Sequence, residues 1–119
     1  MAAPNIVNVT TITGKTAVLN VSTVATDIVT NSAASNKVFK INSLIIANID
    51  GATAADVTAS VFRSSFEFKV AHTISVPADA SLVVLSKDTQ IYLEEGDSIR
   101  LTASANSRLQ AVCSYEDIS

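Results

Sequence analysis

The chain has 119 residues, of which 48% are apolar and only 16% charged, with a net charge of −3. One domain with its own core fits this length, and the weak acidic charge with scattered Lys and Arg residues argues against direct nucleic-acid binding. The single cysteine, Cys113, excludes an internal disulfide, and without a signal-peptide pattern or an apolar run of ~20 residues we expect synthesis in a reducing cytoplasm and no membrane contact.

Short runs rich in Val, Ile and Thr, separated by Gly, Asn, Asp and Ser, predict an all-β chain. No stretch holds a helical period for three turns, although residues 50–57 could form one helical turn. Strands at this spacing predict an antiparallel β-sandwich or jelly roll, with residues 1–119 as a single domain. In chain order the predicted strands are Asn5–Ile12, Thr16–Val21, Thr26–Thr30, Val38–Asn48, Val57–Arg63, Glu67–Val76, Leu82–Leu85, Gln90–Leu93, Ser98–Ser104 and Leu109–Glu116.

The alternation of side chains predicts which faces are buried. It is most regular from Phe66 to Val76, where the even-numbered residues are apolar except for His72. We therefore expect this strand to lie half in the core, with His72 as a hydrogen-bonded core histidine. The last two strands show the same pattern, and their predicted core residues are Ile99, Leu101, Ala103, Leu109, Ala111, Cys113 and Tyr115.

The segment from Ile41 to Ile49 is apolar on both faces. Strict alternation places Leu44 and Ile46 opposite the face of Ile41, Ile45 and Ile49. A strand that is apolar on both faces needs cover on both faces. Either a second copy of the chain or a loop of the same chain provides that cover. The apolar Val18 and Val112 also fall on predicted outward faces, so we expect Leu44, Ile46, Val18 and Val112 to form a contact between subunits of a homo-oligomer.

Three carboxylates, Glu94, Glu95 and Asp97, surround Gly96 between two predicted strands. A glycine at this point supplies the positive φ of a tight turn, and the carboxylates keep the turn solvated. A calcium site would need further oxygen ligands from elsewhere in the fold, such as Asp50, Asp56 or Asp88. The pattern favours the turn, and we expect neither a catalytic site nor a cofactor.

Two other motifs suggest chemistry that their context does not support. The run Thr13–Thr16, TGKT, matches the end of a phosphate-binding loop, but Val9 stands where that motif requires glycine and a predicted strand follows where it requires a helix. We therefore predict a hairpin turn through Gly14 and Lys15. Cys113 lies on an inward face and is predicted to be a buried thiol.

A family resemblance gives the only direction toward function. The stretch INSLIIANIDG at residues 41–51, the VPA turn at 76–78, the LEEGD turn at 93–97 and the closing SYEDI at 114–118 resemble small virion structural proteins of tailed phages, especially those of marine cyanobacteria. The resemblance implies a component of the particle, with other phage structural proteins as partners, at the capsid surface, the neck or the tail.

Two functions from different classes follow. The first is a non-enzymatic, homo-oligomeric virion subunit made in the host cytoplasm. The alternative is a β-sandwich binding module that recognises a host-surface glycan through loops such as residues 30–37, with Tyr92, Tyr115 or Phe66 exposed in a groove. An enzyme would require the carboxylates around Gly96 to meet His72.

Overall fold

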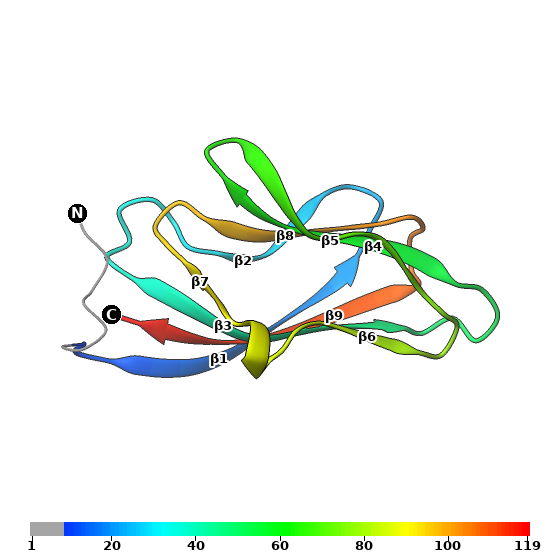
Figure 1. Cartoon of the computed structure of the whole chain (residues 1–119), viewed down its shortest axis with the longest axis horizontal. Coiled ribbons are helices and arrows are strands. Elements are labelled where there is room, and N and C mark those ends of the chain that lie inside the picture. Colours follow the sequence, from blue (N-terminus) through cyan, green and yellow to red (C-terminus); the bar gives the residue numbers. More distant parts are fainter. Residues whose placement is uncertain (1–8) are drawn as a thin grey trace.

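The computed structural model describes residues 9–119, most of which lie in two antiparallel sheets packed face to face (Figure 1). Within these residues the chain also makes a 3-10 turn, η1 (Lys87–Thr89). The possible helical turn at residues 50–57 is not formed, because residues 50–54 are a loop and a strand begins at Ala55. The strands are β1 (Ile12–Val21), β2 (Thr26–Thr30), β3 (Val38–Asn48), β4 (Ala55–Arg63), β5 (Phe66–Val76), β6 (Ser81–Leu85), β7 (Ile91–Leu93), β8 (Ser98–Ala103) and β9 (Leu109–Ile118).

The strands pair in a nested order. Sheet A has the order β1-β9-β3-β6, with β7 also paired to β3, and sheet B has the order β2-β8-β4-β5. The first strand therefore pairs with the last, the second with the one before it, and β4 with its chain neighbour β5. This nesting wraps an antiparallel ribbon into two layers, which is the jelly-roll arrangement. The predicted antiparallel sandwich is confirmed, and the strand order makes it a jelly roll.

The core lies between the two sheets. The predicted inward residues of β8 and β9 are buried, apart from the partly buried Tyr115. Tyr115 packs against Phe39 of β3, with their ring centroids 5.2 Å apart. No helix in residues 9–119 is long and apolar enough to cross a membrane.

A bulge in β3 reverses the predicted orientation of Leu44 and Ile46. Pairing with β9 is regular up to Ile41, then skips Asn42 and resumes at Ser43. One extra residue shifts the alternation of side chains by one position. Leu44 and Ile46 therefore point into the chain's own core, with 1% and 0% of their surface exposed. Their predicted place in a subunit contact is wrong, and the core between the sheets, rather than a loop or a second copy, covers them.

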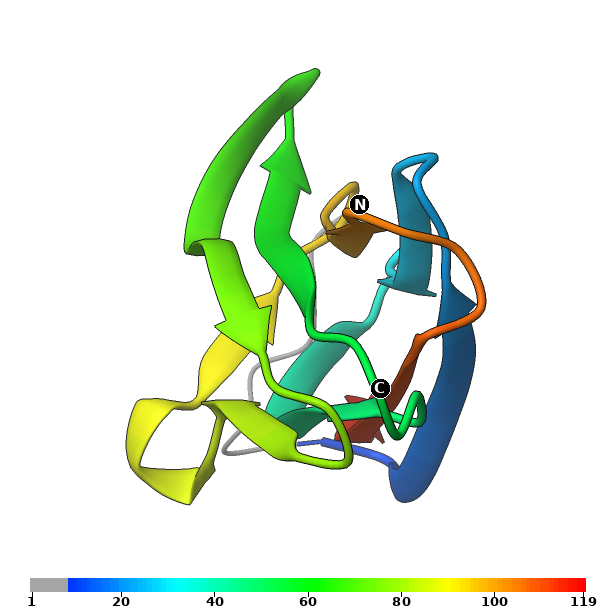
Figure 2. The same ribbon diagram turned by 90° about the vertical axis from the view of Figure 1, so that its right-hand side faces the viewer.

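The strand predicted to be half-buried, β5, is an exposed edge strand instead. It pairs only with β4, and the turn end of this hairpin projects beyond the rest of the sandwich (Figure 2). Of its predicted apolar face only Val76 is buried, and His72 is exposed rather than in the core. Alternation is the same in edge and central strands, so it could not reveal this position.

Of the first predicted strand, Asn5–Ile12, residues 9–11 are not strand and only Ile12 belongs to β1, which contains the whole second predicted strand, Thr16–Val21. Residues 5–8 lie outside the described residues, and β1 runs unbroken from Ile12 to Val21. The predicted hairpin turn through Gly14 and Lys15 is wrong, because both residues lie within β1. Lys15 Nζ is 2.9 Å from Asp117 Oδ2 in the neighbouring strand β9. The lysine of the TGKT motif is therefore engaged in an ion pair between two neighbouring strands of sheet A.

Candidate interaction surfaces

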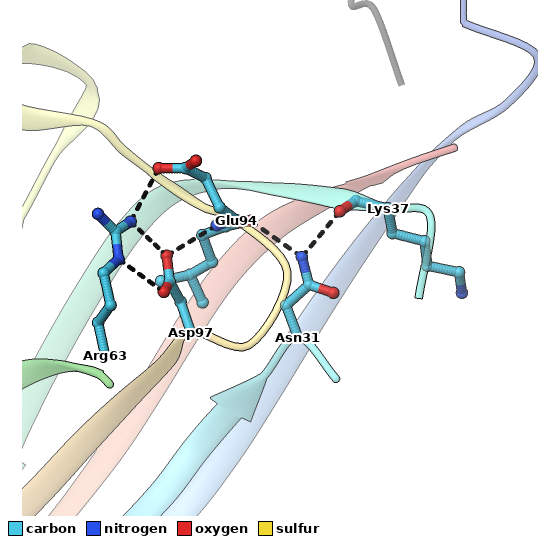
Figure 3. A network of polar contacts seen from close by, with 6 residues as sticks. Asn31, Lys37, Arg63, Glu94 and Asp97 are labelled. Carbon is cyan, nitrogen blue, oxygen red and sulfur yellow. Dashed lines mark hydrogen bonds and ion pairs between the residues drawn. The ribbon is translucent and has the colours of Figure 1, made fainter. Parts of the chain in front are cut away.

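The carboxylates that follow β7 are held by Arg63 from the end of β4 (Figure 3). Arg63 donates from Nε to Asp97 Oδ1 at 2.8 Å and from Nη2 to Asp97 Oδ2 at 2.5 Å. The Asp97 side chain is 2% exposed and also accepts the backbone N–H of Glu94 at 2.9 Å. Glu94 stays on the surface and receives Arg63 Nη2 at 2.9 Å. The turn before β8 is thereby tied to the β4–β5 hairpin.

Asn31 fixes the same turn from the end of β2. Its side chain is fully buried, and Nδ2 donates to the carbonyl oxygens of Lys37 at 2.9 Å and Leu93 at 3.0 Å (Figure 3). Its backbone N–H donates to the Asp97 carbonyl, and its own carbonyl accepts the Gly96 N–H. A buried amide with all these partners acts as a structural bridge between loops.

The predicted tight turn at Gly96 is confirmed, but the role predicted for Asp97 is corrected. Gly96 has φ of 88°, and Asp97 is a buried ion-pair partner rather than a solvated carboxylate. Glu95 accepts the backbone N–H of Asn36 at 3.1 Å. Within residues 9–119, no three His, Cys, Asp or Glu side chains form a group that could hold a metal ion. The hypothesis of a calcium site at this turn therefore has no ligand group in this part of the chain.

Two buried carboxylates have lowered pKa values. Burial alone raises the pKa of Asp97, but the hydrogen bonds from Arg63 and the Glu94 N–H, with the charge of Arg63, outweigh it and leave the pKa below 3.8. Burial also raises the pKa of Asp117, but hydrogen bonds from Lys15 and Lys37, with the charges of both lysines, outweigh it and leave the pKa lowered. Both groups are charged at neutral pH, whereas a general acid needs a pKa near the working pH. The arrangement suits anchoring rather than proton transfer.

We expect Gly96→Ala to lower the free energy of unfolding by about 1–2 kcal/mol, because a Cβ is strained at positive φ. No atom lies within 4 Å of an added Cβ at Gly96, so the backbone conformation alone causes the loss. Gly14→Ala is the matched control, since its site in β1 is equally open and has no positive φ. Urea unfolding of both variants measures the difference. Equal stabilities would contradict the strained turn.

A row of exposed branched side chains crosses the outer face of sheet A. Val18 of β1 lies opposite Val112 of β9, Val112 lies opposite Ile45 of β3, and Ile45 lies opposite Val83 of β6. Their exposed fractions are 73%, 40%, 37% and 59%, respectively. We call these four residues the outer row. Val18 and Val112 therefore lie on the outward face as predicted, whereas Ile45 and Val83 were missed.

The residues beside the outer row are small or uncharged. On one side the register aligns Asn20, Gln110, Ala47 and Ser81, and on the other it aligns Thr16, Ser114 and Ser43. A shallow hollow of about 310 Å³ lies between β1 and β9, lined in part by Val18, Asn20, Gln110 and Val112. Small neutral side chains lose little rotamer entropy and need no charge desolvation when they are covered. This face is suited to being packed against another surface.

A second apolar surface lies beneath the β4–β5 hairpin. A hollow of about 320 Å³ is lined by Val61, Arg63, Phe68, Ile91 and Tyr92. We call it the β5 hollow. The aromatic residues of the glycan hypothesis do not meet in one groove. Tyr92 lines this hollow and Tyr115 packs against Phe39, while the loop of residues 30–37 contributes no lining residue.

Cys113 is buried in the core, as its inward position in β9 predicted. Burial raises the pKa of its thiol to about 11. The reactive thiolate is therefore scarce at neutral pH, and the sulfur is covered. Because this is the only cysteine of the chain, copies in the native conformation have no accessible thiol with which to form a disulfide.

Comparisons with known proteins find a similar fold but no family. No family model matches the chain, and no curated protein sequence matches it. A solved structure described as "Bacillus endospore appendages form a novel family of disulfide-linked pili" is similar, with a TM-score of 0.54 and 15% sequence identity. The alignment covers 92% of this chain and 88% of that chain. At this identity the likeness supports the β-sandwich architecture across nearly the whole chain.

Proposed function

We propose that this chain is a non-enzymatic structural subunit of a tailed-phage particle, which assembles with copies of itself through the outer face of sheet A. The observation that carries the proposal is the outer row, an exposed apolar line that spans four strands without a charged residue. Contiguous exposed apolar surface of this kind marks interaction sites in soluble proteins.

The size of the face fits a stable contact. Strands β1, β9 and β3 are 10 or 11 residues long, and with β6 beside β3 the face is roughly 30 Å long and roughly 20 Å wide, on the order of 600 Å² of flat area. A standard protein interface buries about 800 Å² on each partner. The apolar row in the middle with small polar side chains around it also matches the usual division into a dry centre and a polar rim.

Two likenesses support the particle role. The turn and strand motifs of the sequence resemble virion proteins of tailed phages, and the similar solved structure is described as one of endospore appendages that form pili. Those pili are described as disulfide-linked. The buried single cysteine of this chain points instead to non-covalent contacts.

The self-contact predicts that Val112→Asp weakens assembly about tenfold or more, because it places a charge at the centre of the outer row. Sedimentation velocity at high micromolar concentration measures the oligomer, and circular dichroism checks the fold. Ala33→Asp adds the same charge in an exposed loop and is the matched control. A parent protein that stays monomeric, or a Val112→Asp protein that assembles like the parent, would contradict this contact.

The virion role has its own test. Antibodies raised against the purified chain are expected to label intact particles by immunogold microscopy at one station, the capsid surface, the neck or the tail. Mass spectrometry of purified particles should find peptides of the chain in many copies. Particles that lack both the label and the peptides would rule out the role as a virion component, whatever the result for Val112→Asp.

A further inference from the structure

β5 leaves one backbone edge of sheet B unpaired. The strand is 11 residues long and pairs with β4 on one side, and no strand of residues 9–119 pairs with the other side. A free edge exposes N–H and C=O groups that can pair with an added strand. Native proteins usually block such an edge by bulges, charges or a covering segment.

Only the later part of this edge is blocked. Pairing with β4 is regular from Phe66 to Lys69, and the register then shifts twice before Ile74. Thr73, within the second irregularity, has φ of 50°. Bulges disrupt the even spacing that a further strand needs. The segment Phe66–Lys69, beside the turn of the projecting hairpin, is therefore the open part of the edge (Figure 2).

This open segment carries exposed aromatic side chains. Phe66 is 68% exposed and Phe68 is 58% exposed, although both belong to a regular strand. Phe68 also borders the β5 hollow. Large exposed aromatic surface next to unpaired backbone is typical of a contact between chains.

The charges of the segment select a second copy as the partner. Glu67 and Lys69 lie on one face, with Lys69 Nζ 2.9 Å from Glu67 Oε1. When two copies pair antiparallel about a two-fold axis at Phe68, Glu67 of each copy faces Lys69 of the other. The neighbouring registers, centred on residue 67 or on residue 69, place two glutamates or two lysines opposite each other. Opposite charges across a strand pair stabilise it and like charges destabilise it, so one register is favoured.

We propose that the β5 edges of two copies of this chain pair antiparallel, centred on Phe68, so that sheet B continues from one subunit into the next. Phe68 of each copy then faces Phe68 of the other across the axis, and these exposed rings become covered. The inference deepens the proposed self-assembly by adding a second contact. That contact lies on sheet B and uses other residues than the outer row. A substitution that removes one contact therefore leaves the other in place.

Charge exchange tests the pairing. We expect Glu67→Lys and Lys69→Glu, each made in a Val112→Asp background that removes the outer-row contact, to weaken dimerisation about tenfold or more. An equimolar mixture of the two variants should regain the parental dimer to within about threefold, because every facing pair is again of opposite sign. Sedimentation velocity reads the dimer, and circular dichroism checks that each variant is folded.

Two results of the charge exchange would overturn the proposal. Single variants that dimerise as well as the background protein, or folded variants whose mixture stays monomeric, exclude this register. If the Val112→Asp background protein forms the same oligomer as the parent, the proposed outer-row contact is contradicted. The mixing experiment still decides whether the β5 edges pair.

Cross-linking checks the position of the two-fold axis. A cysteine at position 68 faces the same residue of the other copy across the axis, at the Cα separation that a disulfide requires, whereas cysteines at position 66 lie on opposite sides of the axis and do not face each other. Phe68→Cys is therefore expected to form a covalent dimer under mild oxidation about tenfold faster than Phe66→Cys, its matched control. Equal rates, or faster linkage at position 66, would overturn the register.

Discussion

Leu44→Ala is expected to lower the free energy of unfolding by about 2–5 kcal/mol, as for other large-to-small changes in a packed core. Leu44 is 1% exposed and belongs to the core cluster between the sheets. The Leu44 side chain lies between the two sheets, whose paired strands limit movement of the surrounding residues. The cavity left by the missing methyl groups therefore cannot collapse easily. Urea unfolding at low micromolar concentration, where self-association contributes least, measures the loss.

Val18→Ala is the matched control for Leu44→Ala. It also removes methyl groups from a strand of sheet A, but its side chain is mostly exposed, so the expected loss is below about 1 kcal/mol. The pair separates two roles that the sequence pattern had combined. A Leu44→Ala protein as stable as the parent, but with weaker self-association, would return Leu44 to the subunit contact and contradict the bulge in β3.

Asp97→Ala is expected to cost about 2–3 kcal/mol. The change removes both hydrogen bonds from Arg63 and leaves the Glu94 N–H without its acceptor. Breaking a buried ion pair costs about 3–5 kcal/mol, and the loss here is smaller because the half-exposed Arg63 regains water. Glu94→Gln is the control, since it removes only the surface ion pair to the same arginine, worth below about 1 kcal/mol.

The dependence of stability on pH follows from the lowered pKa of Asp97. Its pKa in the folded chain lies below the ordinary value of 3.8, so near that pH the unfolded chain binds more protons than the folded chain. The stabilisation is fully present above pH 3.8 and is lost as the pH falls through the folded pKa. Asp97→Ala should therefore flatten the acid side of the stability curve, and an unchanged acid slope would contradict the ion pair as its cause.

Most strand positions could be predicted from the sequence because strands and turns have local signals. Val, Ile and Thr runs bounded by small polar residues gave β2 and β3 at their observed bounds and placed the other strands from β4 onward within two residues. The inward faces of β8 and β9 were also correct. In those strands the alternation is not interrupted, so the faces follow from counting.

The errors came from features that have no local signal. The skipped residue Asn42 in the β3–β9 register reverses the face of every residue after it, and nothing in the segment marks that point. The edge position of β5 depends on the strand order of the whole sheet. The partner of Asp97, Arg63, lies on another strand, so the ion pair could not be inferred from the turn itself.

The outer row was only half predictable for the same reason. The register between β1 and β9 has no shift, so alternation placed Val18 and Val112 correctly. Ile45 was assigned the wrong face by the shift in β3. Val83, in a short strand without clear alternation, had no assigned face, and only the register across four strands joins these residues.

Because Cys113 is buried, its thiol can report on transient opening of the native fold in the unmodified chain. A water-soluble thiol reagent can reach the sulfur only when the strands around the centre of β9 separate. The rate of modification therefore measures how often the native fold opens, without any engineered label. Comparing that rate in free subunits and in the proposed assemblies would show how much of the protection arises within one chain and how much neighbouring copies add.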